Sequence, residues 1–218
     1  MKRVVFTAVV CLLIGIGIGY LLFTSFGKDS PNLAASPTPA VSVFPESAKP
    51  DGDTDLVEAA SKGVKLIKAG DYEKLAEMVH PEDGVYFSPY AYIDLKADMH
   101  FTAEQTAKFA SDGTAYLWGY TDGEGAPINL TPKQYFEKYV FNQDYTVSPV
   151  IGRNYIVKSG NSIENVQEVF PDCQFVEFHY PGFDAQYSGM DWCTLRLVFR
   201  EYEGAYKIVA IVHDQWTI

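Results

Sequence analysis

The residues that could do chemistry gather near the C-terminus, in two segments with the composition of β-strands, 192–202 and 206–217. Glu203-Gly204 between them is typical of a two-residue hairpin turn. With that turn, Thr194 lies opposite His213, and strand alternation places a half-polar set of side chains on one face. The set is Trp192, Thr194, Arg196, Val198, Val209, Ile211, His213 and Gln215.

This half-polar face resembles the floor of a small ligand pocket, which is mostly apolar with a few polar groups that orient the ligand. An arginine can bind a carboxylate, so Arg196 is the expected ligand contact, with Trp192, Thr194 and Gln215 beside it. The alternative is that the face is solvated and its charged side chains lie in water. The other face of the hairpin is apolar and must pack against a further layer.

Catalysis would require an acid–base group, and His213 is the candidate because the unperturbed pKa of histidine is near neutral. Asp214 and Asp191 are its candidate carboxylate partners. Asp184 and Asp191 also flank the long segment 181–191, where turn formation is the simpler role for an aspartate. The two hypotheses are a non-catalytic module that binds a small ligand or a protein, and a small hydrolase, isomerase or lyase.

The sequence has none of the motifs that mark the commonest cofactor and metal enzymes. It contains no P-loop, no G-x-G-x-x-G, no G-x-S-x-G, no H-E-x-x-H and no C-x-x-C. We therefore expect no cofactor and no dedicated metal site.

The elements that position these residues form an α+β domain over residues 55–218. An apolar stripe at helical spacing begins after Asp55 and predicts a helix that Gly70 ends. A shorter helix follows, and Thr102 and Thr131 each open a capping box. Three strands end the chain, so we expect helices to cover one face of a curved, mainly antiparallel sheet.

The segment 68–75, Lys-Ala-Gly-Asp-Tyr-Glu-Lys-Leu, followed by Val79-His80-Pro81, resembles the opening of the nuclear-transport-factor-two-like superfamily, which includes the SnoaL-like domains. The long final hairpin, 195–217, is similar as well. The resemblance implies a cone-shaped domain with a pocket and no fixed chemistry, since members include isomerases, dehydratases, cyclases and non-catalytic binders.

Residues 55–218 also resemble an uncharacterised group of exported bacterial proteins. The resemblance is carried by Phe87-Ser88-Pro89-Tyr90, Tyr180-Pro181-Gly182-Phe183-Asp184, Gly189-Met190-Asp191-Trp192 and His213-Asp214-Gln215-Trp216-Thr217-Ile218.

The N-terminus predicts a membrane anchor over residues 1–23. The run Val4–Phe23 has 20 residues without a charge, about the length needed to span the hydrocarbon core of a bilayer. Lys2 and Arg3 favour the cytoplasmic side, so the folded domain is expected outside the cytoplasm. The run ends in bulky residues without a clear cleavage site, which favours an uncleaved anchor over a cleaved signal peptide.

Residues 24–54 are rich in Ser, Pro and Ala and predict a disordered stalk. Basic and acidic side chains balance within 1–54, so the net charge of −11 falls on residues 55–218. An acidic domain without a basic run is a poor partner for nucleic acid or anionic lipid.

Two assembly features stay open. Gly15 and Gly19 form a G-x-x-x-G that could bring two anchors together, and the sheet face could pair in a homodimer. Cys173 and Cys193 lie in the exported domain, where a disulfide is allowed, although hairpin pairing of their strands would keep them apart.

Overall fold

The structure is a computed structural model that describes residues 56–217 of the 218-residue chain. The predicted anchor, residues 1–23, and the predicted stalk, residues 24–54, lie outside the described residues. Within residues 56–217, no helix combines the length and the apolar character needed to cross a membrane.

Two helices open the described part of the chain, as the sequence predicts. α2 (Leu56–Ala69) ends at Gly70, whose φ of 64° suits a residue without a Cβ. α3 (Tyr72–Met78) begins after Asp71, whose side chain caps the helix by accepting a hydrogen bond from the backbone N–H of Lys74. The predicted apolar stripe of α2 is buried, and it consists of Leu56, Ala60, Val64 and Ile67.

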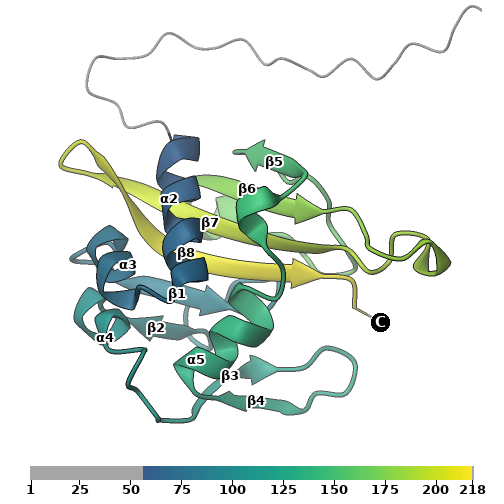
Figure 1. Cartoon of the computed structure of the whole chain (residues 1–218), viewed down its shortest axis with the longest axis horizontal. Coiled ribbons are helices and arrows are strands. Elements are labelled where there is room, and N and C mark those ends of the chain that lie inside the picture. Colours follow the sequence, from purple (N-terminus) through teal and green to yellow (C-terminus); the bar gives the residue numbers. More distant parts are fainter. Residues whose placement is uncertain (1–55, 218) are drawn as a thin grey trace, which may run out of the picture. The chain divides into compact units, whose positions relative to one another are not determined.

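Six strands form one curved sheet (Figure 1). Their order across the sheet is β2 (Met99–Phe101), β1 (Val85–Ser88), β8 (Ala205–Gln215), β7 (Cys193–Tyr202), β6 (Gln174–Tyr180) and β5 (Val150–Arg153). Neighbours are antiparallel except for β1 and β8, which run parallel. The predicted α+β class with a mainly antiparallel sheet is confirmed.

The chain between β2 and β5 completes the helical layer. It contains α4 (Ala103–Ala107), the two-stranded sheet of β3 (Tyr116–Tyr120) and β4 (Pro127–Leu130), α5 (Pro132–Tyr135), the π-helical turn η1 (Phe136–Val140) and the 3-10 turn η2 (Tyr145–Val147). Both predicted capping boxes are confirmed. The side chains of Thr102 and Thr131 each accept a hydrogen bond from the backbone N–H three residues on. The side chains of Gln105 and Gln134 in turn accept from the backbone N–H of those threonines.

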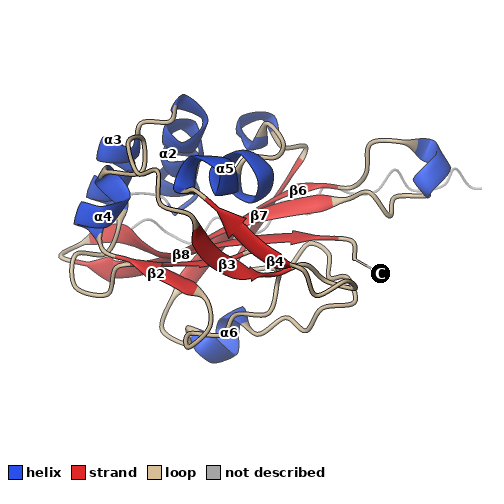
Figure 2. Cartoon of the chain, turned by 90° about the horizontal axis from the view of Figure 1, so that it is seen from below, coloured by secondary structure: helices blue, strands red, loops and turns tan. Residues whose placement is uncertain are grey.

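The two faces of the six-stranded sheet are covered by different parts of the chain (Figure 2). Helices α2 to α5 cover one side, which we call the helix face, and enclose the larger hydrophobic core. The segment 154–173 with the short α6 (Val166–Val169) covers the other side. We call this second side the Arg196 face, because the side chain of Arg196 lies on it.

The pairing of β7 with β8 differs from the prediction at one point. Phe199 lies opposite Ile208, but Val198 lies opposite Ala210, so Val209 is an extra residue on β8. An extra residue of this kind is a β-bulge, and it moves every later side chain of its strand to the other face.

The bulge exchanges the faces of His213 and Asp214, because sequence alternation places His213 on the Arg196 face and Asp214 on the other. His213 lies opposite Leu195 on the helix face, and Asp214 lies opposite Thr194 on the Arg196 face. The prediction that His213 shares a face with Arg196 and Thr194 is therefore wrong. It assumed an unbroken ladder, and the bulge breaks that ladder.

The two cysteines of the described domain are free thiols. Cys193 lies opposite Tyr180 at one end of the β6–β7 pair. Cys173 directly precedes Gln174, which lies opposite Phe199 at the other end. The long antiparallel pairing separates the thiols, as the hairpin pairing of their strands predicts.

Candidate functional site

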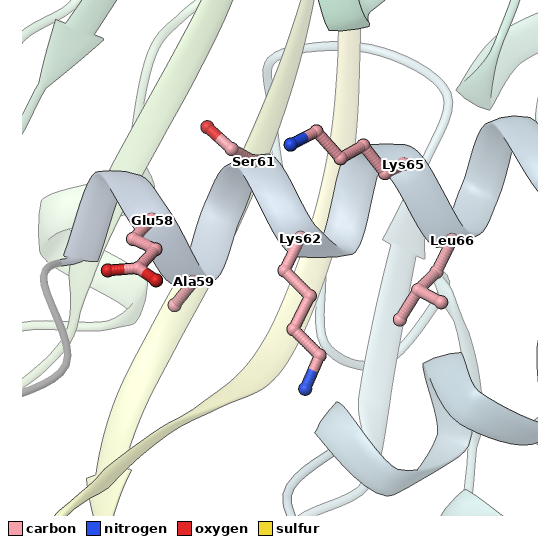
Figure 3. A pocket seen from close by; sticks show the side chains of 6 residues that line it. All are labelled: Glu58, Ala59, Ser61, Lys62, Lys65 and Leu66. Carbon is pink, nitrogen blue, oxygen red and sulfur yellow. The ribbon is translucent and has the colours of Figure 1, made fainter.

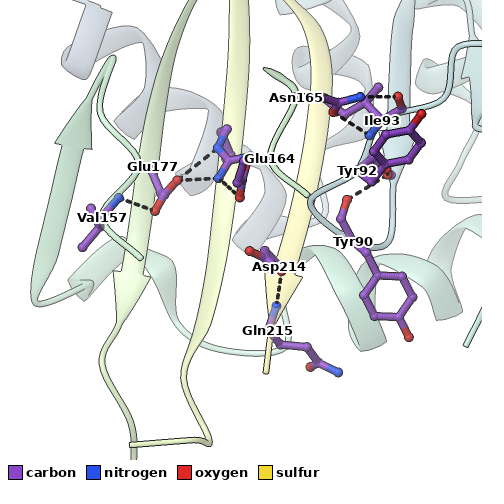
Figure 4. Close-up of polar contacts among 11 residues, drawn as sticks. Tyr90, Tyr92, Ile93, Val157, Glu164, Asn165, Glu177, Asp214 and Gln215 are labelled. Carbon is purple, nitrogen blue, oxygen red and sulfur yellow. Dashed lines mark hydrogen bonds and ion pairs between the residues drawn. The ribbon is translucent and has the colours of Figure 1, made fainter. Parts of the chain in front are cut away.

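Arg196 is the centre of a buried polar cluster on the Arg196 face, and its side chain has no exposed surface. Glu177 lies opposite it on β6 and accepts hydrogen bonds from Nε at 3.0 Å and Nη2 at 2.7 Å. Glu164 accepts from Nη1 at 2.8 Å and Nη2 at 2.9 Å (Figure 4 labels both carboxylates). The guanidinium is thus bound by two carboxylates at once.

The charges of this cluster hold it together inside the sheet. Burial alone would lower the pKa of Arg196, but the attraction of Glu177 and Glu164 outweighs burial and raises that pKa. The guanidinium therefore keeps its charge. Removing one partner from such a buried pair leaves an uncompensated charge and typically costs about 3–5 kcal/mol.

Asp214 adds a third carboxyl group to the Arg196 face, and it is almost completely buried. Its Oδ1 accepts a hydrogen bond from the backbone N–H of Gln215 at 2.9 Å (Figure 4), while Oδ2 has no hydrogen-bond partner among the described residues. Burial raises the pKa of Asp214 to about 8, and repulsion from Glu164 adds to the shift. Asp214 therefore holds a proton at neutral pH.

His213 is buried on the opposite side of the sheet, under the helices. Its Nδ1 donates to the carbonyl oxygen of Pro89 at 2.9 Å, and its Nε2 lies 3.2 Å from Nδ2 of Asn142. The ring of Tyr139 packs edge-on against it. Burial lowers the pKa of His213 to about 4, so the imidazole is neutral and both of its nitrogens are engaged.

The expected acid–base pair of His213 with Asp214 does not form, because consecutive residues of a strand point to opposite faces. Asp191 cannot replace Asp214, since its Oδ2 accepts the backbone N–H groups of Phe183 and Asp184 at 2.9 and 2.7 Å and so caps a loop. The structure therefore separates the three residues proposed for catalysis.

Three of the four predicted ligand-binding residues are buried, and they alternate along one strand direction from residue 192 to residue 196. Arg196 and Thr194 share the Arg196 face, and the Oγ1 of Thr194 lies 2.9 Å from Nδ1 of His179 on β6. Trp192 is buried, and its Nε1 has no hydrogen-bond partner among the described residues. Gln215, the fourth, is half-buried at the end of β8, and the bulge moves it to the helix face. The prediction that it shares a face with Arg196 is therefore wrong.

Sequence reasoning missed Glu177, His179 and Glu164 as members of this cluster. Glu177 and His179 alternate along β6, so pairing β6 with β7 would have placed Glu177 beside Arg196 and His179 beside Thr194. Glu164 gives no such signal, because it lies in a segment without a repeating pattern.

Residues 154–165, which we call the strap, cross the Arg196 face and contain no helix or strand. The backbone N–H of Val157 donates to Oε1 of Glu177 at 3.0 Å (Figure 4), and Nδ2 of Asn161 donates to the carbonyl of Thr217 at 3.1 Å. Asn165, at the end of the strap, exchanges two hydrogen bonds with the backbone of Ile93. The strap thereby closes the polar cluster off from solvent.

A surface groove of about 470 Å³ lies elsewhere, along α2 (Figure 3). A single helix supplies the side chains that line it, which are Glu58, Ala59, Ser61, Lys62, Lys65 and Leu66. None of the residues predicted for the site lines this groove, so the polar cluster under the strap is the candidate site.

No family model and no curated protein matches the chain. Among solved structures, a calcium/calmodulin dependent protein kinase II association domain from Xanthomonas campestris is similar, with 13% identity, coverage of 77% of this chain and 92% of that chain, and a TM-score of 0.30. An NTF2-like protein with a cystatin-like fold from Novosphingobium aromaticivorans has 14% identity, coverage of 72% and 77%, and a TM-score of 0.30.

AusH from Aspergillus nidulans is also similar, with 9% identity, coverage of 74% of this chain and 85% of that chain, and a TM-score of 0.27.

Proposed function

We propose that this chain is a membrane-anchored binding domain that works outside the cytoplasm and catalyses no reaction. The apolar run Val4–Phe23, with Lys2 and Arg3 before it, supports the anchor and the orientation. The ligand is a small molecule held on the Arg196 face.

The separation of His213 from Asp214 by the sheet is the observation that carries this proposal. A general acid or base must come within hydrogen-bond reach of the proton it transfers. His213 is enclosed under the helices with both ring nitrogens engaged, and Asp214 lies on the other face. Arg196, by contrast, already binds two carboxylates through its fork of donors, and this is the geometry that would recognise a carboxylate ligand.

Native mass spectrometry of the full chain, purified in detergent from its own cells, tests the binding function. We expect a retained small molecule that leaves on denaturation and that returns chemically unchanged after incubation with the protein. Conversion of the compound to a product, lost in Asp191→Asn or His213→Gln, would instead favour the small hydrolase, isomerase or lyase.

Protease treatment of intact spheroplasts tests the location. The stalk, residues 24–54, carries the expected cleavage sites, so external protease should release a soluble fragment near residues 55–218. Full protection of the chain until the membrane is permeabilised would place the domain in the cytoplasm and exclude the proposed orientation.

Protein binding is a second candidate function, favoured by the loop between β6 and β7. Its apolar side chains Phe183, Tyr187 and Met190 are each about half exposed, and the loop projects from the sheet around η3 (Ala185–Tyr187) (Figure 1). The carboxylate of Asp191 fixes its first turn, so the loop is organised before any partner binds.

A photo-crosslinking amino acid at Tyr187 in the membrane-bound chain tests this second function. A discrete adduct identifies a protein partner, and an adduct of twice the chain mass identifies a homodimer. The same probe at Ile163, which is also exposed but lies on the strap, is the matched control. Equal adducts from both positions would show non-specific contact.

A further inference from the structure

Glu164 holds Arg196 in the way that a bound carboxylate ligand would. Its two oxygens each take one guanidinium nitrogen, at 2.8 and 2.9 Å, in a parallel two-bond pair. This geometry is typical of the recognition of a free carboxylate by arginine. Glu177 already neutralises the same guanidinium from β6, so the sheet holds Arg196 in place without Glu164.

Glu164 comes from the strap, which is packed loosely compared with the sheet beneath it. The apolar side chains of Tyr155 and Ile163 on the strap are 61% and 71% exposed, so they contribute little burial. Ile156 packs partly buried on the smaller core, and polar bonds hold the rest of the strap, including that of Lys158 Nζ to the carbonyl of Gly189 at 3.0 Å. Segments with few buried apolar contacts open at low free-energy cost.

Three buried polar atoms under the strap have no hydrogen-bond partner among the described residues. They are Oδ2 of Asp214, Nε1 of Trp192 and Oγ1 of Thr217. Trp192 directly precedes β7 and lies diagonal to Asp214 on β8. Gly160 of the strap packs on the ring of Trp192, and Asn161 bonds to the backbone carbonyl of Thr217, while Asp214 lies on the sheet face that the strap crosses.

Unpaired polar atoms in a protein interior are rare because each costs free energy. Two of these atoms belong to groups that can donate, the indole N–H of Trp192 and the hydroxyl of Thr217. Asp214, which holds a proton at neutral pH, can donate as well. A ligand with acceptor oxygens would satisfy these donors while its carboxylate binds Arg196.

We propose that the Arg196 face is a binding site for a small organic acid, and that Glu164 occupies the ligand's carboxylate position until such an acid displaces the strap. The exchange replaces one carboxylate by another, so the buried charge does not change. This inference rests on the proposed binding function and names the class of its ligand.

Carboxylate rescue of a Glu164→Ala variant tests the inference, with the full chain in detergent and propionate as the probe. Propionate at ten times its Kd should raise the melting temperature of Glu164→Ala by about 3–5 °C relative to chloride at equal ionic strength. The wild type should shift by less than about 1 °C, because Glu164 competes. Glu168→Ala, which alters an exposed glutamate of α6, is the matched control.

Hydrogen exchange of the strap separates ligand replacement from general stabilisation. In Glu164→Ala with saturating propionate, we expect β6 and β7 to regain protection while residues 154–165 stay open. The isosteric Glu164→Gln serves as the second variant if Glu164→Ala does not fold. Equal shifts for Glu164→Ala and Glu168→Ala, or a larger response to inorganic phosphate than to propionate, would overturn the proposal.

These outcomes are distinct from those of the proposed function. If native mass spectrometry detects a retained small molecule without a carboxylate, the binding function is supported and only the proposed ligand class is wrong. Rescue by propionate without any retained cellular ligand would support the site and place its natural ligand at low occupancy in the cells used.

Discussion

Three residues that a sequence would group as one polar site have different environments in this fold. Arg196 keeps its charge because Glu177 and Glu164 surround it, whereas Asp214 is protonated and His213 is neutral at pH 7. Burial is the dominant cause for the last two, and it disfavours the charged form of each. At the residue scale, the charge of Arg196 is kept by its two carboxylate partners, whereas burial suppresses ionisation of Asp214 on the same face and of His213 on the opposite face.

Asp214 should make the domain less stable as the pH rises. Its pKa is about 8 in the folded state, against about 3.9 when unfolded. Its proton-linked stability is therefore fully present below about pH 4 and is lost as the pH rises through about 8. Asp214→Asn removes this titration, so relative to wild type it should gain about 4 kcal/mol in unfolding free energy between pH 5 and 9.

Urea unfolding at pH 5, 7 and 9 measures this difference, with Asp172→Asn at an exposed position as the control. If the pH profiles of wild type and Asp214→Asn run parallel, Asp214 is ionised in the fold and the account of the buried cluster is wrong.

His213 should have the opposite pH dependence. Its pKa is about 4 in the fold against an ordinary value of 6.5, so the stability linked to it is present above pH 6.5 and is lost as the pH falls through about 4. The expected loss between pH 7 and 4 is about 3 kcal/mol. A His213→Gln variant should be less stable at neutral pH but should lack this acid-dependent loss. Thermal unfolding from pH 4 to 7 gives the comparison, and equal acid sensitivity of the two proteins would contradict it.

At the element scale, local signals in the sequence predicted local structure well. Thr102 and Thr131 mark helix starts because a capping box lies within four residues. The bulge at Val209 carries no comparable signal, since it depends on how β7, β8 and the layers on both faces pack together. That single residue decides whether His213 or Asp214 shares a face with Arg196. The sequence could therefore predict Arg196 and Thr194 on this face, but not that Asp214 lies there in place of His213.

The tight turn of the final hairpin gives a test at this scale. Glu203 and Gly204 have φ values of 51° and 74°, the left-handed region that a primed hairpin turn requires. Gly204→Ala should cost about 1 kcal/mol of stability through backbone strain alone, because a Cβ there would meet no atom within 4 Å.

Gly113→Ala is the matched control, since a Cβ there also meets open space and its φ is not positive. We expect the control to change the unfolding free energy by less than about 0.5 kcal/mol. Equal losses at both glycines, measured by urea unfolding, would rule out backbone strain as the cause.

At the scale of the whole molecule, the parallel pair of β1 and β8 joins the first half of the domain to its last strand. Tyr86, Phe87 and Ser88 lie opposite Ala210, Ile211 and Val212. Contacts so distant in sequence cannot be inferred from propensity or periodicity, which explains why the strand order was not predicted. They also make the C-terminus part of the core of the fold.

We therefore expect the domain to fold without residues 1–54 of the chain but not without its last residues. A fragment of residues 55–218 should unfold cooperatively within about 2 °C of the full chain, because both helical and sheet layers lie in this part. Removing residues 213–218 takes away the His213 bond to Pro89, the Asp214 carboxyl and the backbone bond from Trp216 to the carbonyl of Trp192. We expect that truncation to lower the melting temperature by more than 10 °C. If the truncated chain has the same melting temperature as the fragment of residues 55–218, the part of β8 after Val212 does not contribute to stability.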